Sequence, residues 1–242
     1  MTDAVRTLKE WTDAARKIVF FGGAGVSTES GIPDFRSTGG LYHQEWKYPP
    51  ETILSHTFYK SNPEEFFRFY RAKMLCPDAK PNAAHKKLAE WEREGKLLAV
   101  VTQNIDGLHQ AAGSKQVYEL HGSVHRNYCE KCGKFYDLNY ILHTTGVPRC
   151  DCGGVIKPDV VLYEESLDSD VLEKAIRHIM AADLMIVGGT SLAVYPAAGL
   201  LQYYDGLDLV LINKTETPYD RRASLIIREP IGQVMSEAVR GL

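Results

Sequence analysis

The sequence predicts an α/β fold whose core is a parallel β-sheet. Short apolar runs recur along the chain, and stretches with helical spacing separate them. Buried strands that alternate with helices are typical of a parallel sheet covered by helices on both faces. The runs also end in glycine or polar residues, as at Gly22–Gly25 and Thr102–Asp106. Because ligands bind beyond the carboxyl ends of the strands in such sheets, these residues are candidates for a functional site.

The predicted elements follow one another in a regular order. A first helix covers residues 3–16, where one face carries Val5, Leu8, Trp11 and Ala15. Buried strands are predicted at Ile18–Phe21, Leu97–Val101, Val117–Leu120, Val160–Leu162, Leu184–Val187, Leu207–Ile212 and Leu225–Ile227. Further helices are predicted at Leu167–Ala182, with Leu172, Ala175, Ile176 and Ile179 facing inward, and near Gly232–Arg240.

Two stretches interrupt this alternation. Residues 36–80 are rich in aromatic residues and proline, and they indicate helices between loops. Residues 125–157 contain most of the cysteines. We expect both to be insertions that together form a smaller lobe. The large domain then comprises residues 1–35, 81–124 and 158–242, and the whole chain, 1–242, forms a single functional unit.

Composition and charge narrow the function classes. The chain has 242 residues, of which 44% are hydrophobic and 24% charged, as in ordinary globular proteins. Its formal net charge of -3 gives no global positive field that would hold nucleic acid. The apolar runs are too short to span a bilayer, and the N-terminal residues lack the apolar core of a signal peptide. We therefore expect a cytoplasmic enzyme with no direct nucleic-acid partner and no membrane partner.

The cysteines predict a metal site. Four of the five are clustered, as Cys129-x-x-Cys132 and, further on, Cys150-x-Cys152. Zn²⁺ binds four thiolates in tetrahedral geometry, and a Cys-x-x-Cys turn supplies two of them. Four sulfur ligands leave no open coordination position, so such a zinc is structural. The alternative, four unrelated thiols, is disfavoured by the clustering, and Cys76 stands alone as an ordinary small side chain.

The glycine turn after the first strand is a weaker signal. Gly23 and Gly25 would let the backbone approach a phosphate closely. The usual dinucleotide fingerprint fails, however, because Thr28 stands where a third glycine is expected. The turn therefore indicates either an unusual nucleotide site or one of the many glycine-rich turns of α/β proteins.

Polar residues at two other strand ends are candidates for catalysis. His121 precedes Gly122 at one end, and Asn104 and Asp106 follow another strand. A neutral imidazole is a suitable general base near pH 7. The alternative is that His121 is a structural histidine and that Asn104 and Asp106 only cap turns.

Several longer segments resemble the signatures of the sirtuins, the NAD-dependent protein lysine deacylases. Gly23–Arg36 resembles the first signature, Thr102–His109 the second and Glu119–Gly122 the third. The paired cysteines match the zinc module of the family, and Gly189–Pro196 and Ile212–Asn213 match the adenosine side. The resemblance extends over about residues 5–240, in the order of the family.

The resemblance implies a Rossmann-like large domain and a small domain made of a structural zinc module and a helical module. NAD and an acetyl-lysine peptide or protein would meet in the cleft between them. Implied NAD contacts are Gly23, Ala24, Gly25, Thr28 and Arg36 at the phosphates, Phe35 beside the leaving nicotinamide, Gln103 and Asn104 at the ribose, Ile105 and Asp106 at the carboxamide, and Gly189, Thr190, Ser191, Asn213 and Ile231 at the adenosine half. The implied zinc ligands are Cys129, Cys132, Cys150 and Cys152, and the implied peptide-binding strand is Val160, Val161, Leu162 and Tyr163.

The implied reaction is lysine deacetylation in which NAD is consumed. The acyl oxygen attacks the anomeric carbon of the nicotinamide ribose, nicotinamide leaves, and an alkylimidate forms. The implied catalytic residues are His121, Asn104 and Asp106, of which His121 is the general base on the ribose hydroxyls and also contacts NAD. Water completes the reaction to free lysine and O-acetyl-ADP-ribose.

The chain departs from the family pattern at three points. Gly22 stands where threonine is usual, the second cysteine pair is one residue shorter, and Tyr163-Glu164-Glu165 replaces Phe-Gly-Glu. An ungapped alignment on Pro81–His85 places Phe67 and Tyr70 where relatives that prefer succinyl or malonyl groups carry Tyr and Arg. Because no guanidinium would then bind an acyl carboxylate, we predict a preference for acetyl and other uncharged acyl groups.

Three other functions compete with deacetylation. Mono-ADP-ribosyl transfer would share the first chemical step. A non-catalytic NAD-binding sensor would not need His121, Asn104 and Asp106. A zinc-ribbon nucleic-acid module would need more basic residues than the cysteine segment carries, since acidic residues offset them.

Overall fold

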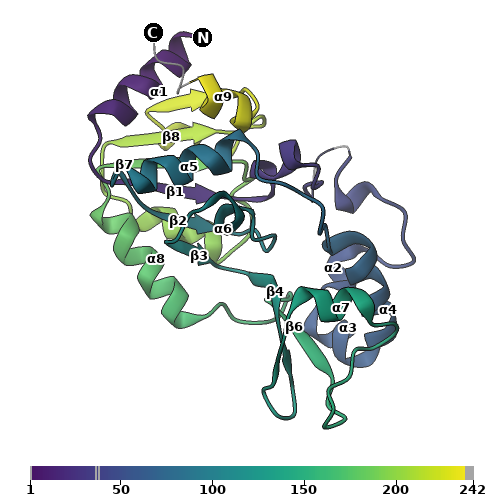
Figure 1. Cartoon of the computed structure of the whole chain (residues 1–242). Coiled ribbons are helices and arrows are strands. Elements are labelled where there is room, and N and C mark those ends of the chain that lie inside the picture. Colours follow the sequence, from purple (N-terminus) through teal and green to yellow (C-terminus); the bar gives the residue numbers. More distant parts are fainter. Residues whose placement is uncertain (1, 36, 38, 238–242) are drawn as a thin grey trace.

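The computed structural model describes residues 2–35, 37 and 39–237, and its main element is a six-stranded parallel sheet (Figure 1). The strand order is β3-β2-β1-β7-β8-β9, and each neighbouring pair is parallel. The strands are β1 (Ile18–Gly22), β2 (Leu97–Thr102), β3 (Val117–Glu119), β7 (Leu184–Gly188), β8 (Asp208–Ile212) and β9 (Leu225–Ile227). The predicted parallel α/β core is therefore confirmed.

Helices cover both faces of this sheet because alternate strand residues point to opposite sides. Phe20, Val100 and Ile186 face a core shared with α1 (Asp3–Ala14), α5 (Ala83–Arg93) and α9 (Ile231–Glu237). Their sequence neighbours Phe21, Val101 and Val187 face a second core, shared with α8 (Ser169–Ala181) and the 3-10 segment η5 (Ala197–Tyr203). The continuous apolar runs of the sequence are thus strands that are buried on both faces.

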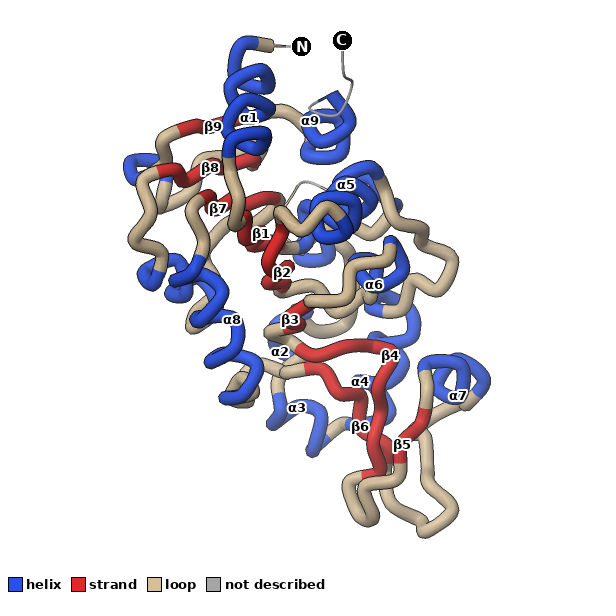
Figure 2. The backbone as a smooth tube through the Cα atoms, turned by 60° about the vertical axis from the view of Figure 1, so that its left-hand side comes forward, coloured by secondary structure: helices blue, strands red, loops and turns tan. Residues whose placement is uncertain are grey.

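A second, smaller sheet lies beside the main one (Figure 2), and Cys129 is the last residue of one of its strands. Its order is β5-β4-β6, from β4 (Gly122–Cys129), β5 (Phe135–Tyr136) and β6 (Ile156–Val160), and its pairs are antiparallel. The lobe also contains α2 (Pro50–Ile53), α3 (His56–Ser61), α4 (Pro63–Phe69), the π-helical turn η4 (Tyr70–Met74) and α7 (Leu138–His143). These elements share an aromatic core drawn from residues 53–75 and 124–162. The exact domain boundaries given above stay a prediction.

The strand prediction at Val160–Leu162 was wrong in two respects. The strand β6 ends at Val160, and it pairs with β4 in the small sheet instead of joining the parallel core. The sequence signal failed because β6 contains Lys157, Pro158 and Asp159, which interrupt the apolar run at its start.

The remaining elements are short or differ from prediction only at their ends. They are α6 (Leu108–Ala112), η1 (Ala24–Val26), η2 (Thr28–Ser30), η3 (Leu41–His43) and η6 (Asp220–Arg222). The last helix, α9, is described as far as Glu237, and residues 238–240 of the predicted helix lie outside the described residues. Among the described helices, none is both long and apolar enough to cross a membrane.

The carboxyl ends of β1, β2 and β7 meet at one point of the main sheet. Gly22, the last residue of β1, pairs with Thr102 on one side and with Gly188 on the other. From β1, the sheet continues through β2 and β3 on one side and through β7, β8 and β9 on the other. Such a reversal of strand order opens a crevice, which is where ligands bind in open α/β sheets.

Candidate active site

A cavity of about 1120 Å³ lies at these strand ends, between the main sheet and the small lobe. Its volume lies slightly above the range of about 300–1000 Å³ that is typical of ligand and cofactor sites. All the NAD and peptide contacts predicted above line this cavity, with the exception of Arg36, which lies outside the described residues. The four clustered cysteines do not line it.

Two glycine loops approach each other at the floor of the cavity. The Gly25 N–H donates to the Gly189 carbonyl at 2.8 Å. A Cβ on Gly25 would lie 2.7 Å from the Cα of Gly189, and Gly189 itself has a φ of +59°. The loops after β1 and β7 therefore fit together only when both residues are glycine. Nearby, the Thr28 hydroxyl donates to the Gly25 carbonyl at 3.0 Å.

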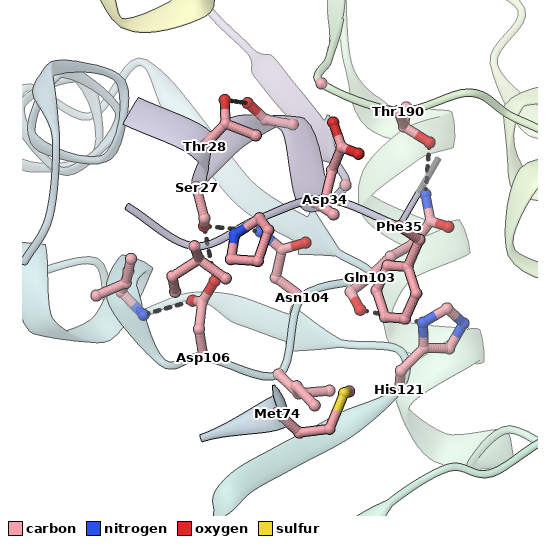
Figure 3. A pocket seen from close by; sticks show the side chains of 18 of the residues that line it. Ser27, Thr28, Asp34, Phe35, Met74, Gln103, Asn104, Asp106, His121 and Thr190 are labelled. Carbon is pink, nitrogen blue, oxygen red and sulfur yellow. Dashed lines mark hydrogen bonds between the residues drawn. The ribbon is translucent and has the colours of Figure 1, made fainter. Parts of the chain in front are cut away.

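His121 is fixed by its neighbours in one tautomer. Its Nδ1 lies 3.0 Å from the backbone carbonyl of Gln103, which can only accept a hydrogen bond. Nδ1 therefore carries the proton, and Nε2 carries a lone pair. Burial lowers the pKa of His121 below its ordinary value of 6.5, and the hydrogen bond to Gln103 opposes this shift in part. His121 is thus a neutral base, and Figure 3 shows its ring beside that of Phe35.

Ser27, Asn104 and Asp106 form a hydrogen-bonded group on the other side of the cavity (Figure 3). The Ser27 hydroxyl donates to Asp106 Oδ2 at 2.6 Å and accepts from Asn104 Nδ2 at 3.1 Å. Asp106 Oδ1 also accepts from the backbone N–H of Leu108 at 2.9 Å. Asp106 therefore stabilises the turn that leads into α6, whose N-cap residue is Gly107, and in addition contacts Ser27. Sequence reasoning missed Ser27, although its hydroxyl lies within the quoted glycine motif.

Gln103 and Thr190 connect the two sides of the strand reversal. Gln103 Nε2 donates to Thr190 Oγ1 at 2.9 Å, and Thr190 Oγ1 also accepts from the N–H of Leu192. Directly after β8, the Asn213 side chain donates to the carbonyl of Thr215 at 2.9 Å. These bonds fix the orientations of Thr190 and Asn213, two of the predicted adenosine-side residues.

The opposite wall carries aromatic residues. Phe35 packs edge-on against Tyr42, with ring centroids 5.6 Å apart, and borders the core of the small lobe. The Tyr42 hydroxyl lies 2.6 Å from that of Tyr163, so the loop after Phe35 is connected to the segment after β6. Sequence reasoning singled out Phe35 and Tyr163 but not Tyr42, because a contact between hydroxyls so far apart in sequence leaves no local pattern.

The predicted peptide-binding segment is already well hydrogen-bonded. The N–H of Val161 donates to the His121 carbonyl at 3.0 Å, and that of Tyr163 donates to Leu54 at 2.9 Å. The N–H of Leu162 donates to the Glu165 carboxylate at 2.9 Å. The carbonyl groups of Val160, Leu162 and Tyr163 also accept hydrogen bonds, from Lys157, Glu165 and His56. A peptide strand added here, with these bonds intact, would therefore donate to Val161 or to the second lone pair of a carbonyl that already accepts one bond.

Phe67 and Tyr70, which the ungapped alignment matched to the acyl-selecting positions, lie away from the cavity. Both are fully buried in the aromatic core of the small lobe, and neither lines the cavity. Lys73 and Met74, a few residues further on, do line it. The acyl preference stays a prediction.

The cysteine cluster consists of Cys129, the last residue of β4, Cys132 in the turn between β4 and β5, and Cys150 and Cys152 in the turn between α7 and β6. All four sulfur atoms lie within 4.8 Å of one another, and three pairs lie 3.5–3.6 Å apart. A tetrahedral zinc with bonds near 2.3 Å requires sulfurs about 3.8 Å apart. The four thiols therefore fit Zn²⁺, and the shortened pair reaches the cluster because Gly153, with a φ of +80°, turns the chain there.

Gly122 joins the catalytic region to the small sheet and provides a stability test. Its φ is +75°, and a Cβ at this position would overlap the carbonyl oxygen of Asp159 on β6. Gly95 has almost the same φ, +76°, but no atom of the described residues lies within 4 Å of its Cβ position. We expect Gly95→Ala to lower the free energy of unfolding by about 1–2 kcal/mol, the cost of the left-handed conformation. Gly122→Ala should lower it by about 4 kcal/mol or more.

Urea unfolding of the two variants measures this difference, and Gly95→Ala is the control because it shares the backbone strain. Equal losses in the two variants would show that β6 yields easily to a methyl group, and would contradict the prediction.

Comparisons with known proteins agree with this geometry. The model of the Sir2 family matches residues 23–196. A protein of Clostridium acetobutylicum named NAD-dependent protein deacetylase is 58% identical over 99% of both chains. A protein of the same name from Clostridium tetani is 57% identical, also over 99% of both chains.

Solved structures are similar over the same length. A Sir2 protein bound to an acetylated peptide is 40% identical, with a TM-score of 0.86 over 98% of this chain and 97% of that one. A Sir2 protein with a p53 peptide and NAD⁺ is 41% identical, with a TM-score of 0.85 over 98% and 97% of the two chains. The chain has the strand reversal, the paired glycine loops and the fixed histidine described above. Together with the similarity along nearly the whole chain, they show that the protein belongs to the Sir2 family.

Proposed function

We propose that this protein is an NAD-dependent protein lysine deacetylase. The observation that carries the proposal is a neutral histidine, fixed with its Nε2 lone pair available, in a cavity that also contains the two glycine loops. The relatives of the same name support it. When bound, NAD supplies the ADP-ribose that accepts the acetyl group, with release of nicotinamide and O-acetyl-ADP-ribose.

Each part of the cavity wall has a proposed role in holding the two substrates. The backbone at Gly23–Gly25, with Thr28, approaches the phosphates, because the N–H groups of a glycine turn can hold negative charge. Both glycines are required by the loop after β7, since a Cβ on Gly23 would meet Thr190 and a Cβ on Gly25 would meet Gly189. Gln103, Asn104, Ile105 and Asp106 bind the ribose and nicotinamide. The adenosine half lies against Gly189, Thr190, Ser191, Asn213 and Ile231, and the acetyl-lysine peptide lies along Val160, Val161, Leu162 and Tyr163.

His121 acts as the general base in this proposal. Its Nε2 takes a proton from a ribose hydroxyl, while the Gln103 carbonyl holds the ring in place through Nδ1. Phe35 excludes water from the reacting carbon, since an aromatic ring offers no hydrogen bond to a solvent molecule. Asn104 and Asp106 orient the polar groups around the ribose from the other side of the cavity.

The pH dependence of deacetylation follows from His121. Only the neutral imidazole accepts a proton, so activity rises with pH through the pKa of His121 and falls as the ring becomes protonated. Burial places this pKa below 6.5. We therefore expect full activity at neutral pH and an acid limb centred below pH 6.5. Values of kcat/KM for deacetylation, measured from about pH 5 to pH 9, give the midpoint for the free enzyme. A limb centred at or above 6.5 would contradict the assignment.

The deciding experiment measures the masses of the peptide, the protein and the NAD products after reaction. The purified protein is incubated with an acetyl-lysine peptide, with and without NAD. NAD-dependent loss of acetyl, together with nicotinamide and O-acetyl-ADP-ribose, supports deacetylation. Nicotinamide release with ADP-ribose on protein and acetyl retained would instead indicate a mono-ADP-ribosyltransferase. NAD binding without any turnover would indicate a sensor.

Placement in the cytoplasm remains part of the proposal. A reducing compartment keeps Cys129, Cys132, Cys150 and Cys152 available as thiolates for Zn²⁺.

A further inference from the structure

His85 is a buried histidine close to the cavity that the proposed mechanism does not use. It lies in the first turn of α5 and is 0% exposed. Its Nδ1 lies 3.2 Å from the backbone nitrogen of Asn82, and that N–H can only donate. Nδ1 is therefore the acceptor in this pair, so the proton of the neutral ring is on Nε2.

The Nε2–H of His85 points at Ser27, with Nε2 3.5 Å from Ser27 Oγ. Asn104 Nδ2, which also only donates, lies 3.1 Å from the same oxygen. A hydroxyl has one hydrogen and two lone pairs. With donors at both lone pairs, the hydrogen of Ser27 is directed to the remaining neighbour, Asp106 Oδ2, at 2.6 Å. Figure 3 shows Ser27 between Asn104 and Asp106.

The surroundings of His85 keep this arrangement in one state. Burial lowers the pKa of His85 to about 4, although the nearby Asp106 carboxylate raises it in part. The ring of His109 packs against it with centroids 4.7 Å apart, and burial also keeps His109 neutral. His85 therefore donates one hydrogen bond, in one direction, at neutral pH.

We propose that His85 is a positioning residue, which fixes the Ser27 hydroxyl and through it the Asp106 carboxylate and the Asn104 amide for NAD binding. Its effect on the cavity is indirect, because Ser27, Asn104 and Asp106 line the cavity and His85 does not. The inference rests on the proposed function for its effect on NAD binding, whereas the hydrogen-bond order itself does not depend on it.

Two conservative substitutions separate positioning from helix capping. In His85→Asn the side-chain oxygen can replace Nδ1 and keep the bond from Asn82, but nothing reaches Ser27. In His85→Gln the amide nitrogen can replace Nε2 and donate to Ser27, but the bond from Asn82 is lost. If His85 only caps the helix, His85→Gln should therefore be the more impaired variant. If His85 positions Ser27, His85→Asn should bind NAD more weakly than His85→Gln.

We expect His85→Asn to weaken NAD binding about fivefold, the cost of one neutral hydrogen bond, and His85→Gln to bind within about twofold of the wild type. Titration calorimetry with NAD measures both. In a Ser27→Ala background, His85→Asn should cause no further loss, because its effect passes through Ser27. Thermal unfolding without ligand serves as the measure of capping. Equal NAD affinity in both His85 variants, or losses that track stability alone, would overturn the proposal.

A measurement without ligand tests the hydrogen-bond order directly. Nitrogen NMR of the histidine side chains should show His85 as the Nε2–H tautomer, and the Nδ1–H tautomer would overturn the inference. If the wild type binds NAD but does not deacetylate, the proposed function fails while calorimetry and NMR still decide the role of His85.

Discussion

Replacing His121 with alanine should lower the rate of deacetylation by about 10²–10⁴-fold, the usual contribution of a general base. The affinity for NAD should change much less, because the glycine loops and the polar wall remain. His121→Asn is the sharper variant. Its amide N–H can still donate to the Gln103 carbonyl, which His121 Nδ1 now contacts at 3.0 Å, but it offers no basic lone pair at the position of Nε2.

Both variants are expected to be equally inactive, and the asparagine variant should keep the stability of the wild type. Peptide turnover followed by mass, together with thermal unfolding, measures the two properties separately. His143→Ala is the control, because His143 is an exposed histidine of the small lobe that does not line the cavity. Substantial turnover by His121→Asn would show that the proton leaves by another route.

Loss of one cysteine of the cluster should unfold the small lobe. Cys129 and Cys150 are buried and belong to its aromatic core, so a zinc bound there ties the turns to the packed interior. Zinc bound by a four-thiolate site adds directly to the free energy of folding. We expect Cys150→Ser to lose the metal and to lower the free energy of unfolding by more than about 4 kcal/mol.

Metal content per chain and urea unfolding test this prediction. The matched control is Cys76→Ser, which removes the one cysteine outside the cluster and should retain one zinc. A chelator should lower the stability of the wild type and of Cys76→Ser, but have little effect on Cys150→Ser. Unchanged stability of Cys150→Ser would mean that the aromatic core holds the lobe without metal.

The main sheet could be predicted from the sequence because its strands carry a strong local signal. Strands such as β1 and β7 are buried on both faces, so they appear as continuous apolar runs that end in glycine. The small sheet was harder to predict, because β6 begins with Lys157 and Pro158 and is short. Its partner β4 alternates buried and exposed residues less regularly, with a shift in register between Ser123 and Asn127.

The site was predictable wherever its residues fall in strand ends or in family motifs. His121, Asn104 and Asp106 belong to this class. The contacts that orient them do not, because they join segments that are distant in sequence. Ser27 and His85 are 58 residues apart, and Tyr42 and Tyr163 are 121 residues apart. Only the folded chain shows that these side chains meet.

The contact between Gly25 and Gly189 has a consequence for how this chain can change over generations. The backbone at each glycine occupies the space that a side chain on the other would need. Because the clash involves backbone atoms, no change of rotamer can relieve it. A second substitution therefore cannot rescue a first. A single substitution at either glycine is therefore harmful, and no harmless first step leads to a different pair. We expect Gly25 and Gly189 to be retained together during evolution, although 164 residues separate them.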